Sequence, residues 1–183
     1  MSPLILPHGG KHPKIAADAF IAPNAVIIGD VEIGPRASIW FGCVLRGDTN
    51  SIRVGAGTNI QDGTVIHVNE VPEGVDPATP GYRTEIGAGI TVGHMALLHA
   101  CILQDNSFVG MRACIIDGAV VESGAMVAAG ALVTPGKRVK HGELWAGSPA
   151  KPMRPLAQAE IDDFAESARH YCELAESYRT RSA

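Results

Sequence analysis

An aliphatic residue recurs every six positions along most of this 183-residue chain, and no other feature constrains its fold as strongly. The series reads Ile15, Ile21, Ile27, Ile33, Ile39, Leu45, Val54, Ile60, Ile66, Ile86, Val92, Leu98, Leu103, Val109, Ile115, Val121, Val127 and Val133. A period of six is not a multiple of the 3.6 residues in a helical turn, so an amphipathic α-helix cannot explain it. A parallel β-helix does, because each aliphatic side chain then stacks on its equivalent one coil away, about 4.8 Å distant.

Small residues and glycines fall between these aliphatic positions, where a coiled chain has to turn its corners. The chain contains 21 Gly and 12 Pro, many of them at turn-like spacings. This pattern resembles the hexapeptide-repeat proteins, whose chain winds as a left-handed triangular β-helix with three hexads per coil. The left-handed crossover is implied by the resemblance, since crossover connections are usually right-handed. We therefore predict a mainly β fold with a left-handed β-helix domain over residues 1–150 and a loop insertion at about 72–85.

The segment 151–183 has a different character and predicts a C-terminal α-helix and tail. Prolines and glycines break the chain before it, and the apolar residues then recur at intervals of three and four, as on one face of a helix. These residues are Ile161, Phe164, Ala168, Tyr171, Ala175 and Tyr178. We expect this stripe to pack along the outside of the β-helix.

Charge and composition exclude several classes of partner. The formal net charge is −4 and there is no run of Lys or Arg, so neither nucleic acid nor an anionic membrane surface is favoured. The sequence suggests neither a signal peptide nor a membrane span. The cysteines (Cys43, Cys101, Cys114 and Cys172) form no CxxC pair, which is typical of reduced thiols in a cytoplasmic protein.

The repeat places two histidines in register. Counting hexads in threes puts those of Leu45, Ile66 and Leu98 on one face of successive coils. The residues that follow them, Arg46, His67 and His99, are then expected to stack on the outer side. Two such imidazoles can converge on a metal ion.

His94 comes from the preceding face, near a corner, where it is the equivalent of Asp62 one coil earlier. Within one subunit it is expected to face away from the other two histidines. A threefold trimer could bring His94 of a neighbouring copy to the pair, and cyclic symmetry would repeat the composite site three times.

Several segments together resemble the γ-class carbonic anhydrase-like family of bacterial hexapeptide-repeat proteins. They are Arg46–Asp48, Asn59–Gly63, Val65–His67, Val92–His94, Leu98–Cys101 and the later Gly-Ser-Pro-Ala-Lys run. The resemblance implies a homotrimer with one Zn²⁺ (or Fe²⁺ or Co²⁺) per chain, held by His67 and His99 of one subunit and His94 of the next. It implies a metal-bound hydroxide that hydrates carbon dioxide to bicarbonate at the trimer interfaces, which makes the chain a carbonate dehydratase-like lyase.

The resemblance also implies roles for other residues. Gln61 would orient the nucleophile, Asn59 would help to position substrate, and Asp48 would lie around the metal water. Arg46 and Asp62 match a pair that bridges subunits, and an interface salt bridge without a chemical part is an equal alternative. Tyr171 would bring its hydroxyl to the site or pack in the apolar stripe.

Two departures from the family pattern predict weak or latent activity. Thr49 stands where characterised enzymes have a glutamate, and the insertion offers Glu73, Asp76 and Glu85 without a clear match to the family's proton-relaying glutamate. Two further functions stay open. One is a hexapeptide acyltransferase or CoA-thioesterase acting on a CoA ester, although the insertion contains no histidine. The other is a non-catalytic, metal-stabilised trimeric scaffold.

Overall fold

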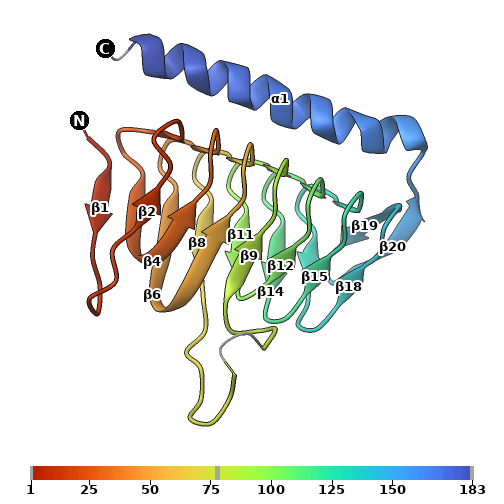
Figure 1. Cartoon of the computed structure of the whole chain (residues 1–183). Coiled ribbons are helices and arrows are strands. Elements are labelled where there is room, and N and C mark those ends of the chain that lie inside the picture. Colours follow the sequence, from red (N-terminus) through yellow and green to blue (C-terminus); the bar gives the residue numbers. More distant parts are fainter. Residues whose placement is uncertain (1, 77–78, 182–183) are drawn as a thin grey trace.

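The computed structural model describes residues 2–76 and 79–181, which wind into a parallel β-helix lying beside one long α-helix (Figure 1). Each coil adds a short strand to each of three faces, and successive coils pair in parallel. This architecture confirms the mainly β fold that the six-residue period predicts.

The helix face is the sheet that lies next to the α-helix, and it ends in an antiparallel pair of strands. Its strands are β3 (Phe20–Ile21), β5 (Ser38–Ile39), β7 (Asn59–Ile60), β10 (Thr91–Val92), β13 (Phe108–Val109), β16 (Met126–Val127), β19 (Glu143–Gly147) and β20 (Ala150–Pro155).

The other two faces belong to one continuous sheet, because two long strands run over the corner between them. The histidine face consists of β1 (Leu4–Leu6), the first halves of β4 (Val26–Ile33) and β6 (Val44–Val54), β8 (Val65–His67), β11 (Leu97–His99), β14 (Cys114–Ile116) and β17 (Leu132–Val133). The charge face consists of β2 (Lys14–Ile15), the second halves of β4 and β6, β9 (Thr84–Ile86), β12 (Ile102–Leu103), β15 (Val120–Val121) and β18 (Arg138–Val139).

The core is the column of aliphatic side chains that the period predicts. All members of the series are buried except Ile15 and Ile21, which lie in the first coils and are half-buried. Glycines follow the aliphatic residue where successive corners stack most closely. A Cβ added to Gly55, for example, would lie 2.4 Å from the carbonyl carbon of Gly87, so no larger residue fits there.

Helix α1 (Gln158–Arg181) packs on the helix face, as the apolar stripe predicts (Figure 1). Three residues of the helix, Phe164, Ala168 and Ala175, are buried at its contact with the sheet. The Tyr171 ring packs edge-on against Trp40, with ring centroids 5.5 Å apart. None of the helices in the described ranges is both long and apolar enough to cross a membrane.

The predicted insertion leaves the β-helix after β8 and returns at β9, and Figure 1 shows it projecting away from the coils. Residues 77 and 78 of the insertion, residue 1 and tail residues 182–183 lie outside the described part. The division into a β-helix domain over 1–150 and a helical segment over 151–183 stays a prediction. Strand β20 crosses the boundary at residues 150 and 151, and it pairs antiparallel with β19.

Candidate metal site

The coil register brings His67 and His99 together from sequence positions 32 residues apart. They are direct partners across β8 and β11, in the same register that pairs Leu98 with Ile66. His67 Nδ1 and His99 Nε2 are 3.2 Å apart. The predicted stacking of these two histidines is therefore observed within one chain.

A carboxylate fixes the outer nitrogen of each ring. His67 Nε2 lies 3.0 Å from Asp48 Oδ1, and His99 Nδ1 lies 2.7 Å from Asp117 Oδ1. An ionised carboxylate only accepts, so these two nitrogens are the ones that carry hydrogen, and a neutral imidazole then has a lone pair on its other nitrogen. The facing nitrogens, His67 Nδ1 and His99 Nε2, are 3.2 Å apart and can then both serve as ligands to one cation.

The donor set fits a divalent transition metal. Nitrogens ~2.0–2.1 Å from a tetrahedral ion are about 3.3–3.4 Å from each other, close to the observed separation. Histidine ligands also typically give their second nitrogen to a carboxylate, which fixes ring orientation and tautomer. His67 and His99, with Asp48 and Asp117 behind them, match both requirements.

His94 lies apart from this pair in the same chain. Its Nδ1 is 2.9 Å from Asp62 Oδ2, so it too has a carboxylate behind one nitrogen, and its side chain is 41% exposed. Within the part of one chain that the structure describes, no three His, Cys, Asp or Glu side chains converge on a common metal position. The sequence predicts that His94 of another copy completes the site, and this stays a prediction.

Asp48 is the most strongly perturbed group beside the histidines. Burial alone would raise its pKa, but the hydrogen bonds from His67 and Arg46 outweigh burial and lower the pKa to about 2. Arg46 thus contacts Asp48 within the chain, while Asp62 contacts His94. The predicted bridging of subunits by Arg46 and Asp62 stays a prediction.

A chain of buried amides and hydroxyls fixes the orientation of Gln61. Its Nε2 donates to Asn59 Oδ1 at 3.1 Å, and Asn59 Nδ2 donates to Thr91 Oγ1 at 2.9 Å. Thr91 Oγ1 lies 3.0 Å from Ser167 Oγ on helix α1. With its amide nitrogen used in this way, Gln61 offers its oxygen as a hydrogen-bond acceptor.

Tyr171 packs in the apolar stripe, and a role of its hydroxyl at the site stays a prediction. It packs against Trp40, and it also lines a cavity of about 320 Å³ together with Gln61, His94 and Ser167. Burial first, and the Asp62 carboxylate second, raise the pKa of the Tyr171 hydroxyl, so it is protonated at neutral pH. The predicted residues Gln61, His94 and Tyr171 therefore share one cavity between the helix face and α1.

The sequence argument missed three residues that the structure adds. Asp117 is the corner residue directly after Ile116, the register partner of His99 one coil later, and no motif marks it in the sequence. Thr91 is the register partner of Asn59, which the repeat also predicts. The contact from Ser167 depends on how α1 docks, for which the sequence carries no signal.

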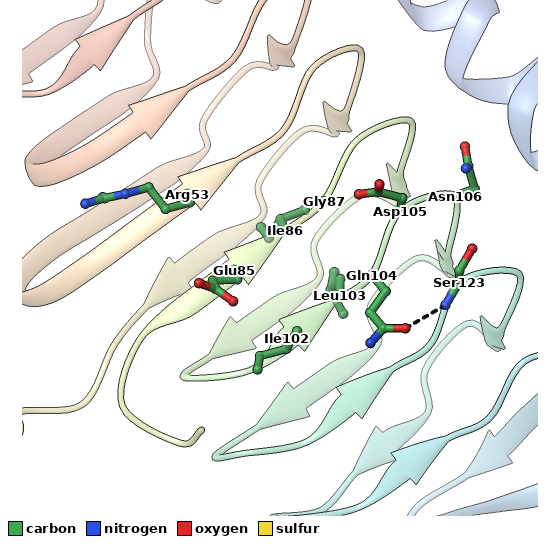
Figure 2. Close-up of a pocket in the computed structure, with 10 residues that line it drawn as sticks. All are labelled: Arg53, Glu85, Ile86, Gly87, Ile102, Leu103, Gln104, Asp105, Asn106 and Ser123. Atoms are coloured by element: carbon green, nitrogen blue, oxygen red, sulfur yellow. Dashed lines mark hydrogen bonds between the residues drawn. The ribbon is translucent and has the colours of Figure 1, made fainter. Parts of the chain in front are cut away.

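A hollow of about 750 Å³ lies on the charge face, away from the histidines (Figure 2). Figure 2 shows Arg53 and Glu85 projecting from neighbouring strands and Gln104 accepting from the Ser123 backbone. Arg53 is bonded to Asp30 at 2.8 Å, and the residues drawn include no histidine. The hollow therefore lacks the chemistry of the histidine face.

Buried thiols add no reactive group. Burial raises the pKa of Cys43 to about 11 and also raises that of Cys101. All four cysteines are unpaired, as the sequence predicts.

Comparisons with known proteins agree with the fold and with the motifs. A family model described as bacterial transferase hexapeptide (six repeats) matches residues 12–47. Gamma carbonic anhydrase 2, mitochondrial, of Arabidopsis thaliana is 49% identical over 173 residues, which is 94% of this chain and 61% of that protein. The chain thus spans about three fifths of the length of this plant relative.

Two further matches cover most of both partners. A carbonic anhydrase of Geobacillus kaustophilus is 41% identical over 176 residues, which is 96% of this chain and 91% of that protein. The solved structure of a hexapeptide transferase family protein from Anaplasma phagocytophilum has 49% identity and a TM-score of 0.87, and the match covers 96% of this chain and 98% of that chain. Since the Geobacillus relative is matched over nearly its whole length, the chain belongs to the γ-class carbonic anhydrase-like family of hexapeptide-repeat, left-handed β-helix proteins.

Proposed function

We propose that the protein is a metal-dependent γ-carbonic anhydrase-like lyase that hydrates carbon dioxide to bicarbonate at sites shared between the subunits of a homotrimer. The observation that carries the proposal is the pair of facing ring nitrogens of His67 and His99, 3.2 Å apart. The carboxylates at the outer nitrogens of both rings leave these facing nitrogens free to bind a cation.

His67 and His99 of one copy and His94 of the next would hold the metal, with Zn²⁺, Fe²⁺ and Co²⁺ as candidates, one per chain. A divalent ion held by three neutral imidazoles keeps an open position and supplies Lewis acidity, which lowers the pKa of water there to about 7. Asp48, Asp117 and Asp62 keep the rings in the tautomer that binding requires.

The exposed surface beside the histidines supports assembly. Outward apolar residues on the histidine face are register partners in successive coils: Leu4, Val26, Val44, Val65, Leu97, Cys114 and Leu132. We call this row the apolar ladder. Val65 and Leu97 are 40% and 41% exposed and lie two residues before the histidines, on the same outward side. Covering such a patch with a second copy would also bring another chain to the metal ligands.

Gln61 and Asn59 would orient the reacting groups. The Gln61 amide nitrogen is already bonded to Asn59, so its free oxygen can accept a hydrogen bond from the attacking water and point an oxygen lone pair at carbon dioxide. The cavity with His94 and Tyr171 would admit this small apolar substrate. Hydration also releases a proton, and Thr49 offers no carboxylate to carry it, which supports a slow hydratase.

The test combines metal analysis with hydration kinetics on protein purified without a His-tag. We expect near one divalent ion per chain and hydration of carbon dioxide above the metal-free rate, measured by stopped-flow pH change. Gln61→Ala should lower the rate about 10–100-fold without releasing metal, as loss of a positioning contact does. Gln104→Ala, on the charge face, is the matched control and should leave the rate unchanged.

Other outcomes separate the remaining functions. Thioester hydrolysis without carbon dioxide hydration by the metal-loaded protein would favour the CoA-thioesterase, and acyl transfer by metal-free protein would favour the acyltransferase. Metal-loaded protein that lacks both activities would favour the trimeric scaffold.

A further inference from the structure

Asp117 differs from the other two carboxylates because it also contacts the insertion. Asn69 Nδ2 donates to Asp117 Oδ1 at 3.2 Å and to the Gly81 carbonyl at 2.9 Å. The backbone amide of Asn69 donates to the Tyr82 carbonyl at 2.8 Å. Asn69 therefore closes the base of the loop and touches the carboxylate that holds His99.

The far end of the insertion is fixed to the other histidine. Buried Thr84 donates its hydroxyl to the His67 carbonyl at 2.6 Å. Gly81 lies against Gly118, so that a Cβ added to Gly81 would be 3.5 Å from the Gly118 nitrogen. One end of the insertion is thus hydrogen-bonded to the His67 backbone, and the other end to the carboxylate that contacts His99.

We propose that Asp117 and Asn69 are positioning residues for His99, and that through them closure of the insertion base sets the affinity of the histidine face for a divalent cation. The proposal rests on the proposed metal site but not on carbon dioxide chemistry. Asp117 holds the Nδ1–H tautomer of His99 with Nε2 free, and Asn69 holds Asp117 in place. Coupling is reciprocal, so bound cation must stabilise the loop base by the same factor by which closure raises affinity.

The test measures zinc affinity by chelator competition in the full-length wild type and four variants. Asp117→Ala should weaken binding about 10–100-fold, as is usual for carboxylates behind histidine ligands. Asp117→Asn should lose less, because its carbonyl still accepts from His99 Nδ1. Asn69→Ala should weaken binding about 5–10-fold, within the usual range of coupling between sites. Asp105→Ala is the control, since this corner carboxylate accepts from the Ala88 backbone, away from the histidines.

Two measurements without activity complete the test. Nitrogen-15 NMR of the metal-free protein should report the Nδ1–H tautomer of His99 in wild type and its loss in Asp117→Ala, a signature that general destabilisation would not produce. Zinc should slow hydrogen exchange of the Asn69 backbone amide in wild type, and less so at that position in Asn69→Ala.

Unchanged zinc affinity in Asp117→Ala and Asn69→Ala would overturn the inference and leave the metal site standing. A wild type that binds no zinc would overturn the metal site and the inference together.

Discussion

The histidine face and the charge face are built from the same hexads but present opposite chemistry. Their inward residues are indistinguishable, since Leu98 on one and Leu103 on the other are both fully buried. On four successive strands of the charge face the outward residues alternate in sign, as Lys14, Glu32, Arg53 and Glu85. Lys14 lies 2.9 Å from Glu32, which lies 3.5 Å from Arg53.

On the histidine face the outward residues do not complete one another's interactions in this way. Leu4, Val65 and Leu97 of the apolar ladder are exposed, and the facing ring nitrogens of His67 and His99 are 3.2 Å apart. The six-residue period fixes where side chains lie, whereas function depends on whether the outward neighbours complete one another's interactions. We propose that the histidine face, which does not do so within one chain, binds a cation and a second copy.

The largest difference should appear in metal content. His99→Ala removes a proposed ligand and should reduce bound metal from near one equivalent per chain to near none, measured by elemental analysis. His141→Ala is the control, because this histidine bonds the Ser123 carbonyl at a distant corner. Full retention of metal in His99→Ala would contradict a metal site on the histidine face.

The next difference should appear in assembly. Leu97→Glu and Ile102→Glu change equivalent outward positions, just before the buried Leu98 and Leu103. Leu97→Glu places a charge in the apolar ladder and should convert the trimer to monomer, as measured by light scattering. Ile102→Glu should remain trimeric. If the two variants had the same oligomeric state, the histidine face would not differ from the charge face in its role in assembly.

Truncating a core residue should destabilise the protein equally beneath the histidine face and beneath the charge face. Leu98→Ala and Leu103→Ala each remove a fully buried side chain, and each should lower the free energy of unfolding by about 2–5 kcal/mol. Denaturant titration of both variants checks this. A large effect at only one of the two positions would show that the faces differ in their cores as well.

The smallest effect belongs to the charge face. The hydrogen bond from Lys14, and then the charge of Arg53, lower the pKa of Glu32 below its ordinary value of 4.5. The stabilisation is therefore fully present above pH 4.5 and is lost as the pH falls through the lowered pKa. Glu32→Gln should cost about 0.2–1 kcal/mol at pH 7 and nothing in strong acid, in thermal melts at both pH values. If Glu32→Gln were still less stable than the wild type in strong acid, the ionised Glu32 carboxylate would not be the source of the stabilisation.

The period alone predicts the β-helix, the inward column and the register that pairs His67 with His99, because a strand repeat is a local property of the chain. A separate spacing of three and four predicts the stripe of Phe164 and Ala168 on α1. The sequence does not predict Asp117, since that contact depends on a corner residue without a motif. The contacts of Asn69 join it to residues 12 and 48 positions later, and such closure leaves no local signal.

The most direct test of the shared site is complementation between two inactive variants. His94→Ala and His99→Ala should each bind little metal alone. In a cyclic trimer assembled from both, one interface joins an intact His67 and His99 pair to an intact His94 of the neighbouring copy. We predict that unfolding and refolding the two variants together restores metal to about one of three sites in each mixed trimer. Mixed trimers that bind no more metal than the separate variants would contradict a site built from two copies.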